Sequence, residues 1–305
     1  MSSKHPVIAV TGSSGAGTTF VKRAFEHIFF REKITAAVVE GDSFHSVTRT
    51  DFKKRSAVEH NFSHFGPEAN DFHALEALFK SYGECGMGKK RYYLHNDQEA
   101  AFHQKRLADA GVTCTSGSGE FTPWEDTPAG TDILFYEGLH GLVKDETADK
   151  RYGGYDVAQY VDLGVGVVPS INLEWIQKIS RDHAERGYSP EATVDTILRR
   201  MPDYIHHITP QFSRTHINFQ RVPTVDTSNP FIARDIPSPD ESMVVIRFAD
   251  PKSFNVDFPY LLAMIHDSFM SRRNSIVVPG GKMVLAMELI LNPIIHDMIE
   301  KRNKA

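Results

Sequence analysis

Blocks of hydrophobic and polar residues along the chain predict an α/β fold. Residues 7–11 form a short apolar run rich in β-branched side chains, which is typical of a strand buried on both faces. In residues 20–30 the apolar positions 21, 24, 25, 28 and 29 fall on one face of a helix. A second apolar run follows at residues 36–40. This strand–helix–strand order predicts parallel strands joined by a right-handed crossover.

The rest of the chain continues this pattern. Further strands are predicted at residues 132–137, 161–168, 243–248 and 275–278, and helices at 69–82, 172–186 and 283–299. Residues 43–130 are more polar and either contribute substrate contacts or form a surface insertion. The chain has no repeat and no clear linker. We therefore expect one elaborated domain over residues 1–305, with a largely parallel, mixed sheet sandwiched by helices.

Charge and cysteine content narrow the class of protein. The 305 residues include 34 Lys and Arg against 39 Asp and Glu, a net charge of −5. This balance argues against a nucleic acid or an anionic membrane as partner, since both reward a basic surface. The two cysteines, Cys85 and Cys114, cannot make a disulfide framework and indicate a reducing compartment. The start of the chain lacks the apolar segment of a signal peptide, so a cytoplasmic location is expected.

A glycine-rich segment follows the first strand and precedes the first helix. Its sequence nearly matches the phosphate-loop pattern G-x-x-x-x-G-K-[ST] and reads Gly12, Ser13, Ser14, Gly15, Ala16, Gly17, Thr18 and Thr19. Such a loop points backbone N–H groups at a phosphate in front of the helix N-terminus. Thr18 departs from the pattern, because lysine normally neutralises the β- and γ-phosphates there. Thr19 occupies the position of the magnesium-binding hydroxyl. The alternative is a tight glycine turn without a ligand.

Two carboxylates follow predicted strands at the sheet edge where ligands of open α/β sheets bind. Asp42 comes after the second strand, and Glu137 ends the third. Together with Thr19 they are candidate Mg²⁺ ligands, and Asp42 is the candidate general base for an attacking hydroxyl. His45 and Arg49 follow Asp42 closely, which favours an anionic acceptor. The alternatives are a helix N-cap at Asp42 and a turn residue at Glu137.

The predicted helix at 172–186 carries basic residues on one face. Lys178 and Arg181 share this face with Glu174 and Glu185. An ordinary solvated face with weak ion pairs is the alternative. Since the phosphate loop lacks its lysine, Lys178 or Arg181 is predicted to neutralise the transferred phosphoryl group. Arg186, Arg199 and Arg200 extend this basic cluster, which suggests a second phosphate in the site.

Histidines carry a weaker signal. His95 is a candidate for contact with a sugar hydroxyl, and a structural role is the alternative. The 15 histidines show no metal-binding pattern, because pairs such as His206 and His207 point to different faces of a regular element.

Several segments together resemble the bacterial class of phosphoribulokinases. They include the phosphate loop, residues 40–45 (EGDSFH), 135–141 (FYEGLHG) and 172–178 (NLEWIQK). The resemblance continues through residues 226–234 (DTSNPFIAR), 257–260 (DFPY) and 275–280 (SIVVPG). The last three segments have no evident chemistry, so they are specific to the family rather than to phosphate binding.

The resemblance implies a single P-loop kinase domain that transfers the γ-phosphoryl group of ATP, with Mg²⁺, to the 1-hydroxyl of ribulose 5-phosphate in carbon fixation by the Calvin cycle. It implies Asp42 as the general base and Glu137 as a metal-side acid. By the same resemblance, Lys178 and Arg181 act in turnover, and the residues that contact the substrate are His45, Arg49, His95 and Arg186.

The resemblance also implies how the enzyme is regulated. Bacterial members likewise lack lysine at the position of Thr18, and Ala16 replaces the cysteine of the plant disulfide switch. Bacterial members form homo-oligomers, are activated by NADH and are inhibited by AMP. Arg31, Arg247 and Arg272 match the arginines of that effector response; for Arg31 and Arg272 surface ion pairing is the alternative.

Two other functions compete with this prediction. One is a kinase for a neutral hydroxyl acceptor such as uridine or pantothenate, against which the pair Arg49 and Arg186 argues. The other is a catalytically silent nucleotide sensor, in which Thr18 marks the loss of phosphoryl transfer.

Overall fold

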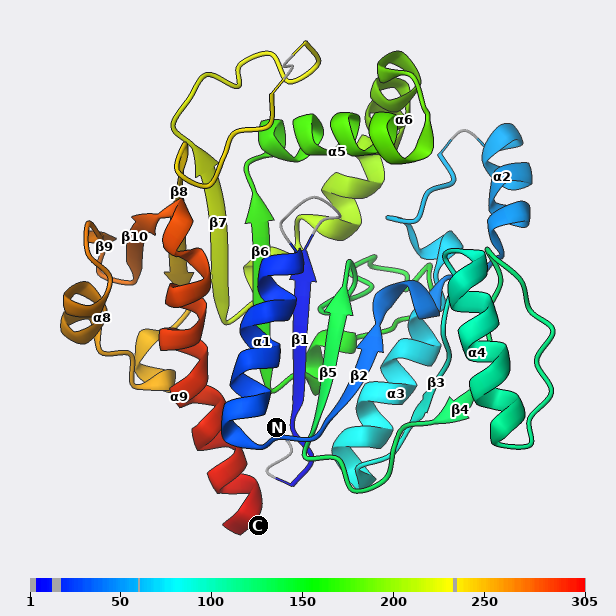
Figure 1. Ribbon diagram of the computed structural model, residues 1–305, viewed down its shortest axis with the longest axis horizontal. Helices are drawn as coiled ribbons and strands as arrows, with labels where there is room; N and C mark the ends of the chain where they lie inside the picture. The colour runs from blue at the N-terminus through cyan, green and yellow to red at the C-terminus, as the bar shows by residue number, and fades with distance from the viewer. Residues whose placement is uncertain (1–3, 13–17, 60, 233–234, 305) are drawn as a thin grey trace.

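An eight-stranded mixed sheet forms the centre of the computed structural model, which describes residues 4–12, 18–59, 61–232 and 235–304 (Figure 1). The strand order is β2-β5-β1-β6-β7-β8-β10-β9. The first five strands in this order are parallel, and β8, β10 and β9 add antiparallel pairs. The predicted largely parallel, mixed sheet is confirmed. The strands span β1 (Val7–Gly12), β2 (Ala36–Glu40), β5 (Ile133–Gly138), β6 (Leu163–Pro169), β7 (Ile217–Pro223), β8 (Ser242–Phe248), β9 (Phe269–Arg272) and β10 (Ser275–Pro279).

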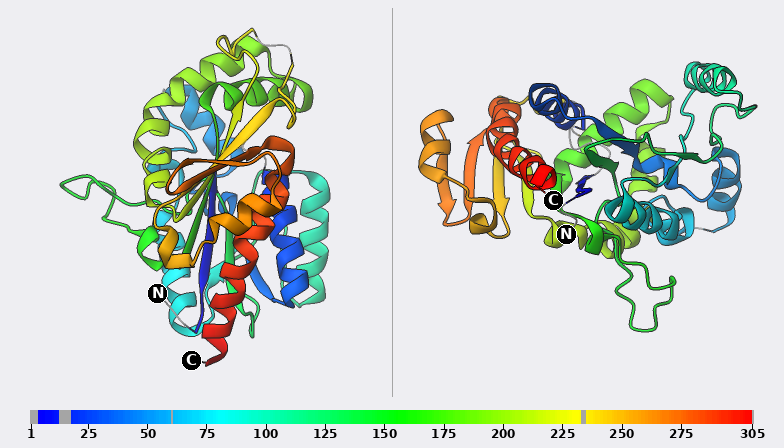
Figure 2. Two further views of the ribbon diagram at one scale, coloured as in Figure 1. Left: turned by 90° about the vertical axis from the view of Figure 1, so that its left-hand side faces the viewer. Right: turned by 90° about the horizontal axis from the view of Figure 1, so that it is seen from below.

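Helices cover both faces of the sheet (Figures 1 and 2). Helices α1 and α9 lie against one face, and α3 lies against the other. The helices span α1 (Thr18–Glu32), α2 (Arg49–Val58), α3 (Phe72–Cys85), α4 (Asp97–Asp109), α5 (Ile171–Arg186), α6 (Pro190–Asp203), α7 (Gln211–Arg214), α8 (Phe258–Met264) and α9 (Met283–Lys304). A short ribbon of β3 (Lys89–Lys90) and β4 (Glu125–Asp126) stands beside α4. Within the described ranges, no helix is long and apolar enough to cross a membrane.

Alternate residues of β1 pack into the two halves of the hydrophobic core, one on each face of the sheet. Ile8 and Val10 pack with Phe25 of α1 on one face, and Val7 and Ala9 pack on the other. Since successive side chains of a strand point to opposite faces, a strand in this position must be apolar throughout. This explains why the first run of the sequence is continuous rather than alternating.

The predicted strands and helices are present, and the structure adds elements that were not predicted: β3, β4, β7, β9, α2, α4, α6, α7 and α8. The helix predicted from residue 69 begins at Phe72, because Asp71 caps it by accepting from Ala74 N–H. Strand β7 was not predicted, since its polar residues Asn218 and Gln220 interrupt the apolar pattern. It forms because it pairs with β6 on one side and β8 on the other.

Candidate active site

A cavity of about 700 Å³ opens at the carboxyl ends of β1, β2 and β5. These strand ends contribute Gly12, Glu40 and Glu137. Three other parts of the chain complete the walls: the turn after β2, residues 64–103, and helices α5 and α6. The prediction that residues 43–130 contribute to the substrate site is thereby favoured over a mere surface insertion. The remaining lining residues used below are Asp42, His45, His64, Tyr93, His95, Glu174, Lys178, Arg181 and Arg200.

Asp42 lies in a 3-10 turn at the end of β2, where it faces two histidines. Its Oδ1 lies 3.3 Å from Nε2 of His45, and its Oδ2 lies 3.8 Å from Nε2 of His95. Partial burial raises the pKa of Asp42, but the hydrogen bond with His45 and the charges of the neighbouring histidines outweigh it and hold this pKa well below its usual range. Asp42 is therefore a carboxylate at neutral pH, with 43% of its side chain exposed to the cavity.

The ring of His45 is fixed from its other side. Nδ1 of His45 lies 2.9 Å from Oδ1 of Asn70. The amide of Asn70 is itself oriented, because its nitrogen donates to the carbonyls of His64 and Gly66. Its oxygen must therefore accept the proton on Nδ1 of His45, and this leaves Nε2 pointing at Asp42.

Close backbone approach brings the ends of β2 and β5 together. A Cβ on Gly138 would lie 2.7 Å from the Cα of Gly41, and a Cβ on Gly41 would lie 2.5 Å from the Tyr136 hydroxyl. Neither neighbour can swing away, since one is backbone and the other is a fully buried ring. The two glycines thus place Asp42 and Glu137 at one edge of the cavity.

A second imidazole lies under the first. The ring of His64 stacks on His45 at 4.0 Å and on Phe52 at 3.8 Å between centroids. Burial lowers the pKa of His64 well below its usual range. Its carbonyl accepts a hydrogen bond from the buried ring of His140, whose pKa burial lowers to about 3. Both of these rings are therefore neutral at neutral pH.

The ribbon of β3 and β4 continues as residues 91–95 paired with residues 119–124. This extended ribbon forms the far wall, and its residues Tyr93 and His95 line the cavity. Arg49 supports this wall from behind: its guanidinium donates to the His95 carbonyl at 2.8 Å and to the Ser118 hydroxyl at 3.2 Å. Arg49 does not line the cavity itself. The structure therefore brings His45 and His95 to Asp42, whereas Arg49 contacts the loop that holds His95.

Helix α5 presents its basic face to the cavity. Lys178 Nζ donates to Asp182 at 2.5 Å, and the Arg181 guanidinium approaches the same carboxylate at 3.2 Å. Asp182 is buried, and so is Glu174, which accepts a hydrogen bond from the Tyr204 hydroxyl. Glu174, Lys178 and Arg181 line the cavity, which favours a role in the site over an ordinary solvated face.

The carboxylate pair fits a magnesium ion of the kind found in kinases. Mg²⁺ in such sites takes one or two carboxylates and completes its shell with substrate phosphates and water. Glu137 and Asp42 supply carboxylates to the same cavity that Gly12 enters from the phosphate loop. No group of three or more metal-ligating side chains occurs in the part of the chain that the structure describes. The oxygens present therefore suit a metal carried in with a polyphosphate.

Some predicted residues lie outside the described residues. These are Ser13, Ser14, Gly15, Ala16 and Gly17, together with the side chains of Thr18, Thr19 and Arg186. Gly12 lines the cavity as expected.

Two of the side chains described above, Asp182 and His64, were not singled out from the sequence, and Arg200 was named only as part of the basic cluster. Asp182 is four residues after Lys178, so the helical spacing was a signal for it. His64 gave no such signal, because folding alone brings it to the cavity from a distant segment.

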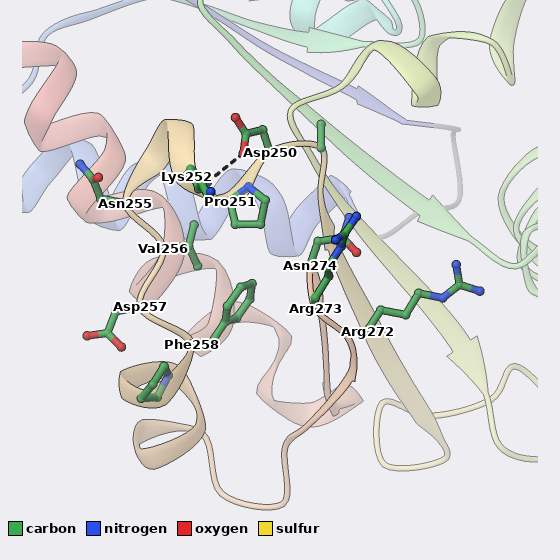
Figure 3. A pocket seen from close by; sticks show the side chains of 12 residues that line it. Asp250, Pro251, Lys252, Asn255, Val256, Asp257, Phe258, Arg272, Arg273 and Asn274 are labelled. Atoms are coloured by element: carbon green, nitrogen blue, oxygen red, sulfur yellow. Dashed lines mark hydrogen bonds between the residues drawn. The ribbon is translucent and has the colours of Figure 1, made fainter.

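The arginines predicted to respond to effectors lie away from this cavity. Arg247 of β8 and Arg272 of β9 are both register partners of Ser275 in β10. Arg31, at the end of α1, lies 3.6 Å from Glu288 of α9. Arg272 alone of the three lines a second pocket of about 1250 Å³. Figure 3 shows this pocket between residues 250–258 on one side and residues 272–274 on the other.

Comparison with known proteins agrees with this geometry. Residues 7–228 match the profile of the "Phosphoribulokinase / Uridine kinase family". The chain is 59% identical to the plasmid phosphoribulokinase of Cupriavidus necator, over 100% of this chain and 99% of that one. It is 58% identical to the phosphoribulokinase of Nitrobacter vulgaris, over 99% of both. The solved phosphoribulokinase from Rhodobacter spheroides superimposes with a TM-score of 0.84 at 51% identity, covering 99% of this chain and 100% of that one. This chain is therefore a kinase and belongs to the phosphoribulokinase/uridine kinase family.

Proposed function

We propose that this chain is a phosphoribulokinase, which transfers the γ-phosphoryl group of ATP to the 1-hydroxyl of ribulose 5-phosphate and yields ribulose 1,5-bisphosphate and ADP for the Calvin cycle. The observation that carries the proposal is a hydrogen-bonded Asp42 carboxylate that shares one cavity with the phosphate-loop strand and the basic face of α5. The likeness to phosphoribulokinases along the whole chain supports the choice of acceptor.

Asp42 acts as the base. The acceptor hydroxyl hydrogen-bonds to Asp42, its oxygen forms a bond to the γ-phosphorus, and the bond from that phosphorus to the bridging oxygen of ADP breaks. The hydroxyl proton goes to Asp42 and the electron pair of the broken bond to ADP. Since its pKa lies below the usual range, Asp42 stays ionised and takes the proton late, as a loose transition state allows.

Lys178 and Arg181 neutralise the charge of the transferred group. Thr18 stands where most phosphate loops have lysine, so the positive charge has to come from another element. Asp182 orients both side chains from α5, and the cation of Lys178 is held close to the cavity. Glu137, Asp42 and Thr19 would hold Mg²⁺, which would supply electrostatic stabilisation of the phosphates.

His45, Arg49, His95 and Arg186 are proposed to bind the acceptor, His45 and His95 directly. Because the guanidinium of Arg49 is engaged with the His95 carbonyl and Ser118, we propose that Arg49 acts by holding His95. Arg200 lines the cavity and brings a positive charge near Phe52 and Phe65, which suits the 5-phosphate.

Measurement of ADP release tests the function. The purified chain is incubated with ATP and Mg²⁺ and with ribulose 5-phosphate, uridine, pantothenate or no acceptor. We expect turnover with ribulose 5-phosphate alone. Turnover with uridine or pantothenate only would identify a kinase for a neutral acceptor. ATP binding without turnover in any of the four mixtures would identify a silent nucleotide sensor.

Regulation by NADH and AMP is proposed from the three arginines. Arg247 and Arg272 flank Ser275 on adjacent strands, whereas Arg31 contacts Glu288 of α9 on another part of the surface. If the three act on one effector, we infer that they do so across an interface of a homo-oligomer. Loss of NADH stimulation in Arg272→Ala, with unchanged activity in the absence of effector, supports this role of the arginine. Equal stimulation of the variant and the wild type refutes it.

A cytoplasmic location remains a proposal from the cysteine content.

A further inference from the structure

The half-buried side chain of Arg91 joins the ribbon to the turn that carries Asp42. Its Nε donates to the Ser43 carbonyl at 2.8 Å, and its Nη2 donates to the His45 carbonyl at 2.7 Å. These two carbonyls belong to the residues on either side of Phe44 in the turn that begins at Gly41. One planar guanidinium thus fixes the backbone of the turn at two points, a geometry that lysine cannot reproduce.

The surroundings of the guanidinium favour this orientation. Its central carbon lies 3.8 Å from the ring centre of Phe121 and 4.6 Å from that of Trp124. In the described chain no carboxylate lies within ion-pair distance of Arg91, and burial lowers its pKa. Two aromatic faces and two carbonyl dipoles therefore stabilise the cation.

The aromatic partners of Arg91 connect it to the other wall of the cavity. Phe121 bridges to Tyr93 across the ribbon, and their rings lie 5.3 Å apart. Tyr93 contacts the rings of both His45 and His95, at 5.8 Å and 5.0 Å. Arg91 is therefore in the ribbon that carries His95, while it hydrogen-bonds to the turn that carries Asp42 and His45.

We propose that Arg91 is a positioning residue for phosphoryl transfer, which fixes the turn of Asp42 and His45 against the ribbon of Tyr93 and His95. This inference rests on the proposed role of Asp42 as the base. Loss of Arg91 should loosen the acceptor side of the cavity and leave nucleotide binding unchanged, because the backbone carbonyls that it holds belong to Ser43 and His45. A displacement of about 1 Å at such a site lowers a rate by roughly 10²-fold.

Chemical rescue of Arg91→Ala tests this directly. We expect kcat to fall about 10- to 100-fold and the KM for ribulose 5-phosphate to rise, with the KM for ATP and the ADP affinity unchanged. Millimolar guanidinium should restore part of kcat by filling the space between Phe121 and Trp124, and ammonium at the same concentration should not. Restoration by both ions alike, or by neither, would overturn the positioning role.

Arg106→Ala is the matched control. Arg106 also packs over a ribbon ring, that of Tyr92, but it pairs with Glu125 and makes no described hydrogen bond to residues 41–45. It should keep wild-type kcat and show no response to guanidinium. If Arg91→Ala does not fold, Arg91→Lys is measured instead. This variant keeps the positive charge and should still have a lower kcat than the wild type. A wild-type kcat in Arg91→Lys would refute the proposal.

Asp42→Asn is measured in parallel, so that the two proposals can fail separately. If Asp42→Asn keeps wild-type kcat, the base assignment fails and the role of Arg91 fails with it. If Asp42→Asn is inactive while Arg91→Ala keeps wild-type kcat, the base assignment stands and the positioning role is refuted.

Discussion

The buried carboxylate of Asp182 lies 2.5 Å from the ammonium nitrogen of Lys178, one turn earlier on α5. Burial lowers the pKa of Lys178, and the hydrogen bond and charge of Asp182 raise it again. Asp182 therefore opposes the effect of burial on the charge of Lys178, which lines the cavity. The same carboxylate orients Arg181, so one acidic residue organises both cations of the helix.

Replacement of Asp182 by Asn should move the alkaline limb of the kcat–pH profile to lower pH. Without the carboxylate, desolvation and the nearby arginines dominate, and Lys178 loses its proton at lower pH than in the wild type. We also expect kcat at neutral pH to fall by roughly 10-fold or more, since one partner of a buried charge pair is lost. Steady-state ADP release as a function of pH measures both effects. An unchanged alkaline limb would mean that Lys178 does not titrate in turnover. Lys178→Met, which lacks the titratable ammonium group, provides the reference profile.

Asp42→Asn should lower kcat by about 10²–10⁴-fold with little change in ATP affinity. The amide keeps the size of the carboxylate but cannot accept the proton in the transition state. Single-turnover kinetics together with ATP titration separate the two effects. Asp51→Asn is the control, because Asp51 belongs to the exposed start of α2 and not to the cavity. A wild-type kcat in Asp42→Asn would remove this residue from the mechanism.

His45→Asn should move the acid limb of the kcat–pH profile to higher pH. In the wild type, the hydrogen bond and charge of His45 are the main causes that lower the pKa of Asp42, against the opposite effect of burial. When they are removed, burial raises the pKa of Asp42, so the base becomes protonated at higher pH. The pH at which kcat falls to half its maximum does not depend on how far the substitution lowers that maximum. His95→Asn should shift the limb less, because His95 lies at 3.8 Å and the His45 contact is 3.3 Å. Equal shifts in the two variants would contradict the assignment.

Gly138→Ala should destabilise the protein by about 1–3 kcal/mol and lower kcat. The added Cβ would meet the Cα of Gly41 at 2.7 Å, so the ends of β2 and β5 must separate and carry Asp42 and Glu137 apart. Urea unfolding and ADP release measure the two consequences. Gly117→Ala is the matched control, since a Cβ there meets nothing within 4 Å. It should change the free energy of unfolding by less than about 0.5 kcal/mol.

His140→Gln should make stability less sensitive to acid. The folded-state pKa of His140 is about 3 against an ordinary value of 6.5, so the unfolded chain binds a proton that the folded chain does not. The contribution of the neutral His140 to the free energy of unfolding is fully present above pH 6.5. It is lost as the pH falls toward 3, at up to about 1.4 kcal/mol per pH unit. Glutamine keeps a donor for the His64 carbonyl without titrating. Urea unfolding between these pH values should give a shallower slope for the variant; equal slopes would show that His140 does not contribute.

The local parts of the fold and site were predictable from the sequence. The strand, glycine loop and helix at residues 7–30 are contiguous, and their periodicities depend only on whether one or both faces are buried. Asp42 and Glu137 were also predictable, because the carboxyl ends of parallel strands meet at one edge of a sheet. Lys178 and Arg181 followed from helical spacing, and their roles stay predictions.

Tertiary structure alone decided which distant side chains complete the site. Arg91 reaches the Ser43 carbonyl across 48 residues of sequence, and His64 stacks on His45 from another segment. Arg49, predicted to bind substrate, donates to the His95 carbonyl, and Arg200 lines the cavity. The physical reason is that a sequence pattern reports which face of an element is buried, whereas a hydrogen bond depends on how separate elements pack. The sequence by itself thus determined the strand ends, the phosphate loop and the chemistry they favour, and packing decided which side chains hold that chemistry in place.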